Sequence, residues 1–207
     1  VLDFVIEKRY SHYHKKNHRG LMRHLIVRRG VRTGELLVNV VTSSEEGFDE
    51  GAFVEMIKSL PLENNVVGIL RTINNRLADA VYCDELRILD GRDYYMEEIM
   101  GLKFKVSAFS FFQTNVVAVE NLYSYAIDLI DDFSNKTAFD LYCGTGTITQ
   151  TLAKKAGKVI GIELVEEAVE AAKENAALNG LDNCEFIAGD VFEVLKNVEE
   201  KPDVIVV

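Results

Sequence analysis

The sequence contains no run of about 18 consecutive apolar residues, the length that a membrane-spanning helix requires. It has only three cysteines, widely spaced and without a Cys-x-x-Cys pair, so neither a disulfide framework nor a metal site is indicated. The start, from Val1, has neither a signal-peptide pattern nor an initiator methionine. We therefore expect a cytoplasmic protein with no membrane segment, and a chain that is a piece of a longer one.

Acidic residues are missing from one part of the chain, although they are abundant elsewhere. The net charge is -10, yet residues 8–34 contain no Asp or Glu. Residues 8–32, here called the basic block, contain nine Lys or Arg, all four His, and Tyr10 and Tyr13. A surface that binds phosphates and stacks on bases has this composition. The same composition is also found in a basic face exposed to solvent and in an arm that pairs with the acidic rest of the chain.

A β-hairpin is expected within the basic block and just after it. Residues 25–27 and 35–41 are apolar runs on either side of a turn-rich stretch with two glycines. Arg28, Arg29 and Arg32 lie near the expected tip, so we expect them to project together as a candidate surface for phosphates.

The rest of the first half combines one expected helix with short strands. Residues 49–60 have helical spacing and stop at a proline, and residues 66–73 have the pattern of a strand. Further short strands are expected around Val81 and within residues 104–109. We take residues 1–105 as a small α+β domain.

Residues 106–207 have the alternation of strands and helices that is typical of a doubly wound parallel sheet. Strands are expected to begin at Ala138, Lys158, Cys184 and Asp203. Helices are expected over residues 116–133, from Thr147, from just after Glu163 to Asn179, and over 191–198. The expected fold class is α/β, with the first half of a Rossmann-like sheet after the small α+β domain.

The end of the first parallel strand carries the clearest motif for a ligand. Gly144 and Gly146 have no Cβ to prevent a sharp turn or to keep a ligand from the backbone. Glu163 ends the next strand, where open α/β sheets bind ligands, and a carboxylate there can accept hydrogen bonds from both ribose hydroxyls. Thr149 stands where dinucleotide sites have a third glycine, so NAD fits less well than S-adenosylmethionine, which has no pyrophosphate.

A second acidic residue, Asp190, follows the third parallel strand. It is placed to accept a hydrogen bond from an adenine amino group. It is equally suited to cap the helix that begins at Val191, since Asp is a favoured N-cap residue. The two roles are compatible. A Gly-x-Gly sequence alone also occurs in ordinary tight turns.

Several motifs together resemble one enzyme family. They are Phe111-Phe-Gln-Thr-Asn115, Asp140-Leu-Tyr-Cys-Gly-Thr-Gly146, Gly161-Ile-Glu163, Glu174-Asn175, Asn179-Gly180 and Gly189-Asp190, together with Gly20-Leu-Met-Arg-His-Leu-Ile-Val-Arg28 and Thr33-Gly-Glu35. The chain closely resembles, over nearly its whole length, the RNA (uracil-5-)-methyltransferases of the RumA/TrmA type. The resemblance implies transfer of a methyl group from S-adenosylmethionine to carbon 5 of a uridine, with 23S ribosomal RNA as the target.

The same resemblance implies roles for individual residues. The residues implied to contact S-adenosylmethionine are Gln113, Tyr142, Thr147, Glu163 and Asp190. Gln113 would lie over the methionine end, Glu163 on the ribose and Asp190 near the adenine. Phe111 would stack on the target base, although it could instead fill the core, as its neighbours Phe109 and Phe112 could.

The family's chemistry requires a cysteine thiolate that adds to carbon 6 of uracil and a base that removes the proton from carbon 5. None of Cys83, Cys143 and Cys184 occupies the place of that nucleophile, so we expect nucleophile and base beyond Val207 and no turnover by this piece. The open edge of an incomplete sheet would allow self-association. Alternatives are a methyltransferase of another class, an RNA-binding module with a vestigial cofactor site and, third, an NAD enzyme.

Overall fold

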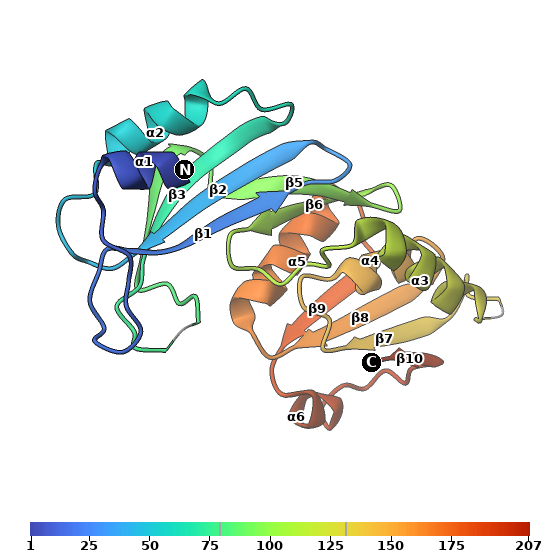
Figure 1. The fold of residues 1–207 in the computed structure, drawn as a ribbon. Coiled ribbons are helices and arrows are strands. Elements are labelled where there is room, and N and C mark those ends of the chain that lie inside the picture. The colour runs from blue at the N-terminus through green and yellow to red at the C-terminus, as the bar shows by residue number, and fades with distance from the viewer. Residues whose placement is uncertain (79, 131) are drawn as a thin grey trace. The chain divides into compact units, whose positions relative to one another are not determined.

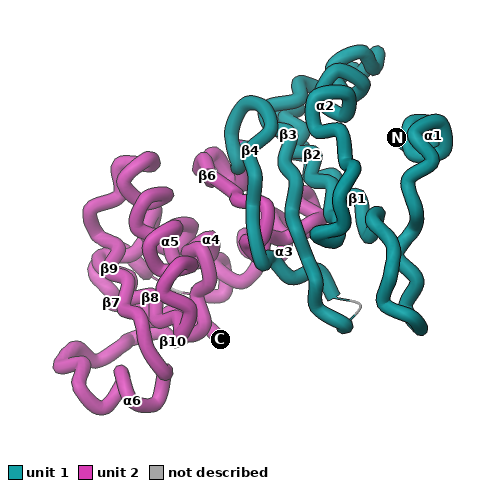
Figure 2. The backbone as a smooth tube through the Cα atoms, turned by 90° about the vertical axis from the view of Figure 1, so that its left-hand side faces the viewer, with its two compact units in different colours: residues 1–95 teal, residues 96–207 magenta. Residues whose placement is uncertain are grey.

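The computed structural model describes residues 1–78, 80–130 and 132–207. They form two compact units, Val1–Tyr95 and Met96–Val207, which Figure 2 draws in two colours. The boundary expected at residue 105 lies inside the second unit, because the backbone of residues 102–107 is hydrogen-bonded to side chains of a helix in that unit. Each unit is described by itself below.

The first unit is a mixed β-sheet that is accompanied by two helices (Figure 1). Its elements are α1 (Leu2–Glu7), β1 (Met22–Arg29), β2 (Glu35–Thr42), α2 (Glu50–Ser59), β3 (Asn65–Ile73) and β4 (Glu85–Gly91). The strand order is β1-β2-β3-β4. The antiparallel pairing of β1 with β2 confirms the expected hairpin. β2 and β3 are parallel and are connected through α2, and β3 and β4 are antiparallel.

The helix α2 covers the sheet because its apolar side chains recur at helical spacing. Phe53 and Ile57, one turn apart, are buried with Val38 and Val40 of β2 and Ile69 of β3 in a single cluster. The expected helix and strand of this region are therefore confirmed, with the strand starting one residue earlier than expected.

Two features of the first unit differ from expectation. Val81 lies in a loop, and the strand expected around it begins only at Glu85. The six-residue helix α1 was not expected, because Val1 at its N-cap position makes no side-chain cap bond and a short helix shows little periodicity.

The second unit contains a four-stranded parallel sheet with strand order β10-β7-β8-β9. From β5 onward the elements are β5 (Tyr94–Ile99), β6 (Leu102–Ser107), α3 (Val116–Asp128), β7 (Thr137–Leu141), α4 (Thr147–Ala153), β8 (Lys158–Glu163), α5 (Glu166–Leu178), β9 (Cys184–Ala188), α6 (Val191–Leu195) and β10 (Val204–Val206). β5 and β6 form a separate two-stranded sheet. The expected alternation of strands and helices, and the Rossmann-like arrangement, are confirmed.

Helices cover both faces of the parallel sheet, because alternate residues of a buried strand point to opposite faces. Val159 of β8 packs in one cluster with Ile127 of α3 and Leu152 of α4. Its neighbour Ile160 packs in another cluster with Val191 of α6. The strand β8 is thus packed on both of its faces.

Two helices are shorter than their apolar period suggests. α3 ends at Asp128, yet Ile130 and Phe133 still pack against the same core cluster from outside the helix. α6 ends at Leu195, and Val198 likewise packs on the core beyond it. None of the helices in the described part of the chain has the length and hydrophobicity needed to cross a bilayer.

Candidate cofactor site and substrate surface

The turn after β7 is built from residues with left-handed backbone conformations. Tyr142, Gly144 and Gly146 have φ values of 66°, 54° and 77°. A Cβ added to Gly144 would meet no atom within 4 Å, whereas one added to Gly146 would lie 2.8 Å from the ring of Phe186 and 3.1 Å from the Cβ of Ala172. Gly144 therefore leaves the space beside the backbone open, and Gly146 allows α4 to pack closely on the sheet and α5.

Glu163 points toward this turn. Its Oε2 accepts a hydrogen bond from the backbone N–H of Gly144 at 3.0 Å, and its Oε1 accepts one from the N–H of Val165 at 3.0 Å. Among the described residues, the carboxylate is in no ion pair. A carboxylate has about four acceptor sites, so Glu163 can accept two further hydrogen bonds from a ligand at the turn.

Asp140 lies beneath the turn and was not expected as a site residue. It is 3% exposed, and its Oδ2 accepts a hydrogen bond from the hydroxyl of Thr149 at 2.6 Å. Burial raises the pKa of Asp140 to about 6, and the hydrogen bonds from Thr149 oppose the shift. The bond between Asp140 and Thr149 ties the end of β7 to the first turn of α4. An Asp inside an otherwise apolar strand was the signal in the sequence.

We predict that Asp140→Asn increases stability above pH 7 by about 1 to 3 kcal/mol, because the neutral amide avoids the cost of a buried charge. The folded pKa lies above the unfolded value, so the folded protein binds the extra proton between about pH 4 and 6, and wild-type stability falls as pH rises through that range. The difference between variant and wild type should therefore shrink as pH falls from 6 to 4. Urea unfolding at several pH values measures the difference in the free energy of unfolding between variant and wild type. A difference that is independent of pH would contradict the prediction.

The ends of the three neighbouring strands lie level with one another. Glu163 is paired with Ala188 in the parallel ladder, and the N–H of Gly189 donates to the carbonyl of Glu163 at 2.9 Å. Asp190 follows and caps α6, since its Oδ1 accepts hydrogen bonds from the N–H groups of Phe192 and Glu193. The capping role is thus confirmed. The contact of Asp190 with an adenine stays a prediction.

Two neighbouring phenylalanines between β6 and α3 differ in exposure. Phe112 is buried against Phe104, with ring centroids 5.9 Å apart, whereas Phe111 is 78% exposed. The core-filling interpretation therefore applies to Phe112 and not to Phe111. Gln113 is also exposed. The side chain of Asn115 caps α3 by accepting from the N–H of Ala118 at 3.0 Å.

Thr147 and Tyr142 lie at the turn itself. The hydroxyl of Thr147, the first residue of α4, is 3.4 Å from the hydroxyl of Tyr123 on α3. Tyr142 is 57% exposed and available to a ligand. Their proposed contacts with a cofactor remain predictions.

Two of the arginines near the hairpin tip point to opposite faces of β1. Arg28 is half-buried and Arg29 is exposed, because neighbouring residues of a strand point to opposite faces. The expectation that these two project together with Arg32 is therefore wrong, although Arg29 and Arg32 are both exposed. The alternation was visible in the sequence once the hairpin had been predicted.

Some members of the basic block have structural roles. The ring of Tyr10 packs on Phe48 in the core and its hydroxyl accepts from the N–H of Asp49, so Tyr10 is not available to stack on a base. Arg23 stacks on Tyr13, 3.9 Å from the ring centre, and donates hydrogen bonds to three carbonyl oxygens. The three carbonyls belong to Asn74, Arg76 and Ala78. Arg23 therefore stabilises the loop after β3.

The three cysteines are poor nucleophiles at neutral pH. Burial raises the pKa of Cys143 far above its usual value and raises that of Cys184 to about 11. Burial and the nearby carboxylate of Asp84 also raise the pKa of the exposed Cys83. Because the thiolate is the reactive form, none of the three is suited to attack a base.

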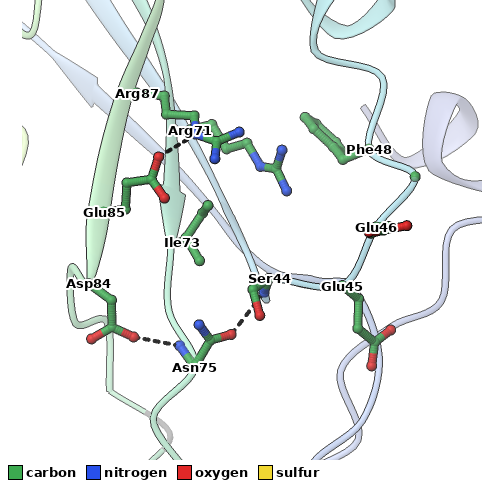
Figure 3. A pocket seen from close by; sticks show the side chains of 11 residues that line it. Ser44, Glu45, Glu46, Phe48, Arg71, Ile73, Asn75, Asp84, Glu85 and Arg87 are labelled. Atoms are coloured by element: carbon green, nitrogen blue, oxygen red, sulfur yellow. Dashed lines mark hydrogen bonds and ion pairs between the residues drawn. The ribbon is translucent and has the colours of Figure 1, made fainter.

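A cavity of about 440 Å³ opens in the first unit (Figure 3). It is lined by residues 44–48, 71, 73, 75, 84, 85 and 87. Among them are the carboxylates Glu45, Glu46, Asp84 and Glu85. The two arginines of the lining, Arg71 and Arg87, both bond to Oε1 of Glu50, at 2.7 and 3.0 Å. With its cations neutralised, the cavity does not offer the positive surface that an RNA backbone requires.

Comparison with known proteins agrees with a cofactor site at the glycine turn. Residues 132–207 match the family described as "Methyltransferase domain". A protein of Clostridium tetani named "Uncharacterized RNA methyltransferase" is 54% identical over 206 residues, which are 100% of this chain and 45% of that protein. The chain thus spans less than half the length of the curated relatives it matches.

Two solved structures have similar folds. The tRNA (uracil-54, C5)-methyltransferase of Pyrococcus abyssi, solved with S-adenosyl-L-homocysteine, has a TM-score of 0.81 and 27% identity, covering 100% of this chain and 48% of that one. The tRNA m1G37 methyltransferase of Methanocaldococcus jannaschii has a TM-score of 0.52 and 18% identity, covering 90% and 53%. The chain therefore has the Rossmann-like fold of a methyltransferase, and over its whole length it is similar to proteins that are named RNA methyltransferases.

Proposed function

We propose that this chain is part of an RNA methyltransferase that transfers a methyl group from S-adenosylmethionine to carbon 5 of a uridine, with 23S ribosomal RNA as the target. The observation that carries the proposal is the carboxylate of Glu163, which faces the Gly144 amide where neighbouring parallel strands end. The similarity in sequence to proteins named RNA methyltransferases supports the choice of RNA.

The residues at the turn fit an adenosyl sulfonium compound. Glu163 has acceptor sites left for ribose hydroxyls, Asp190 has a carboxylate oxygen that its cap bonds do not use, and Gly144 leaves open space beside the backbone. Gln113, Tyr142 and Thr147 complete the proposed contacts. S-adenosylmethionine supplies an electrophilic methyl group on a positively charged sulfur.

Charge at the turn argues against NAD. Asp140 and Glu163 are close enough that the second carboxylate contributes to the raised pKa of the first. Two carboxylates near the turn repel a pyrophosphate and attract a sulfonium cation. The hydroxyl of Thr149, where a dinucleotide site has its third glycine, is bonded to Asp140. The site therefore favours a cationic cofactor.

The methyl transfer needs an activated uracil. Carbon 5 of uracil is a weak nucleophile until a thiolate adds to carbon 6; it then takes the methyl group and S-adenosylhomocysteine leaves. A base must later remove the proton from carbon 5, and the thiolate is expelled from carbon 6. Since Cys83, Cys143 and Cys184 are all held as thiols, we propose that the nucleophile and the base lie outside residues 1–207.

The rival proposals differ in what they lead one to expect. A methyltransferase acting on a base nitrogen is less well supported, because the structural similarity is higher to the C5 enzyme than to the m1G37 enzyme. An RNA-binding module with a vestigial site would not bind S-adenosylhomocysteine in a calorimetric titration.

Arg28, Arg29 and Arg32 stay proposed RNA contacts. Self-association through the outer edge of β10 stays a prediction.

We predict that the full-length protein containing this chain forms 5-methyluridine in a 23S ribosomal RNA transcript, and that residues 1–207 alone form none. Labelled S-adenosylmethionine and mass spectrometry of the nucleosides measure the product. In the full-length protein, a triple replacement of Cys83, Cys143 and Cys184 by serine should leave more than half of the activity. A tRNA transcript is the matched alternative substrate.

Three outcomes would contradict parts of the proposal. Methylation of a base nitrogen would refute the C5 chemistry. Methylation of the tRNA but not of the ribosomal RNA would refute the target. Turnover by residues 1–207, or loss of activity in the triple serine variant, would refute the placement of the nucleophile.

A further inference from the structure

Asn175 of α5 and Asn179, the C-cap residue of that helix, are hydrogen-bonded to the backbone of β6 in the way that a neighbouring strand would be. The N–H of Lys105 donates to Oδ1 of Asn175 at 2.8 Å. The N–H of Lys103 donates to Oδ1 of Asn179 at 2.8 Å, and Nδ2 of Asn179 donates back to the carbonyl of Lys103 at 2.8 Å. Side-chain amides thus satisfy edge groups of β6 that otherwise need another strand or water.

Asn175 is built into the core of the second unit, whereas Asn179 is half-buried at its surface. Asn175 is 1% exposed, and its Nδ2 is buried without a hydrogen-bond partner among the described residues. Asn179 Nδ2 also donates to Oε1 of the fully buried Gln150 at 2.9 Å. A buried amide with an unused donor costs free energy that an apolar residue would avoid. The helix itself gains nothing from that cost, so the contact with β6 accounts for the choice of residue.

β6 leads directly into the segment that carries two proposed site residues. After β6 ends, the hydroxyl of Ser107 accepts from the N–H of Ser110 at 3.2 Å, and Phe111 to Gln113 follow. The buried ring of Phe112 packs on Phe104 of β6. The position of β6 therefore determines where Phe111 and Gln113 lie.

The same helix begins next to the other half of the proposed site. Val165 is the N-cap residue of α5, and its N–H donates to Oε1 of Glu163. One rigid helix thus touches the proposed ribose ligand at its start and β6 at its end. A helix of thirteen residues transmits position between its two ends without bending much.

We infer that Asn175 and Asn179 are positioning residues that hold Gln113 and Phe111 at the correct place for the cofactor and the target base. This inference rests on the proposed function. It gives the Glu174-Asn175 and Asn179-Gly180 sequences a role in the site, although neither asparagine needs to touch a ligand. Asn179 contributes more, because it both accepts from and donates to Lys103.

The test compares Asn179→Ala with Asn183→Ala in the full-length protein. Asn183 is a matched control, because its Nδ2 also donates to two carbonyls, those of Ala153 and Ala156, and among the described residues it makes no bond to β6. We expect Asn179→Ala to raise the Kd for S-adenosylhomocysteine about tenfold and to lower kcat with RNA by a similar factor. Asn183→Ala should lower the melting temperature comparably and leave the Kd within twofold.

Two further measurements keep the test decisive if Asn179→Ala folds poorly. Asn179→Asp keeps the acceptor for the N–H of Lys103 but sets a carboxylate oxygen against the carbonyl oxygens of Lys103 and Gln150, so its Kd should be at least as high as that of the alanine variant. Hydrogen exchange should be faster over residues 103–115 in both Asn179 variants and unchanged there in Asn183→Ala.

The outcomes distinguish a failure of the proposed function from a failure of the positioning role alone. If the wild type does not bind S-adenosylhomocysteine, the proposed function fails and this inference with it. If the wild type binds, and Asn179→Ala binds equally well or Asn183→Ala binds as poorly as Asn179→Ala, only the positioning role is refuted.

Discussion

Replacement of Glu163 by alanine is expected to weaken the binding of S-adenosylhomocysteine by about 100-fold. Two hydrogen bonds from ribose hydroxyls to a carboxylate contribute about 1.5 kcal/mol each, and their loss corresponds to that factor. The variant also loses the bond from Glu163 to the Gly144 amide, which holds the turn in the conformation that faces the ligand. Isothermal titration calorimetry with the full-length protein measures the effect.

Glu167→Ala is the matched control for this prediction. Glu167 is an exposed residue in the first turn of α5, the helix that begins shortly after Glu163. Replacing it by alanine should change the Kd by less than twofold. Glu163→Gln keeps one acceptor oxygen and should give an intermediate Kd. An unchanged Kd in Glu163→Ala would show that this residue does not hold the ribose, and the assignment of the site would have to be abandoned.

Replacement of Gly146 by alanine is expected to destabilise the second unit by about 2 to 5 kcal/mol. A φ of 77° costs a residue with a Cβ about 1 to 2 kcal/mol. The new methyl group would also lie 2.8 Å from the ring of Phe186 and 3.1 Å from Ala172, and such overpacking costs about 1 to 3 kcal/mol. Thermal unfolding should show a melting temperature about 5 to 15 °C lower.

Gly144→Ala separates backbone strain from overpacking. Its φ is 54°, but no atom lies within 4 Å of the added Cβ, so only about 1 to 2 kcal/mol is expected from strain. The same methyl group would occupy the space proposed for the cofactor and should weaken its binding. Phe186→Leu combined with Gly146→Ala should recover part of the lost stability. Equal destabilisation by both glycine substitutions would contradict the proposed difference.

These predictions converge on α5 as the element that organises the proposed site. Its N-terminus is bonded to Glu163, its middle packs on Gly146 through Ala172, and its C-terminal end is bonded to β6. A substitution on this helix can therefore alter cofactor binding without touching the cofactor.

Local sequence patterns determined much of the fold. Alternating and helical periodicities predicted the hairpin of the first unit, the four parallel strands and the helices between them, because periodicity reports which side of an element is buried. The glycines of the turn, the acid at the end of β8 and the capping role of Asp190 could be predicted for the same reason. Each depends on residues within one or two turns of the chain.

Only the tertiary structure decided which distant groups meet. The burial of Asp140 against Thr149, the choice of Phe112 over Phe111 for the core, and the bonds from Asn175 and Asn179 to β6 could not be predicted from spacing. Periodicity shows that a face is covered but not what covers it, and Lys105 and Asn175 are 70 positions apart. Such contacts depend on how the strands are ordered and how the helices pack, and this is fixed when the sheet and its helices assemble.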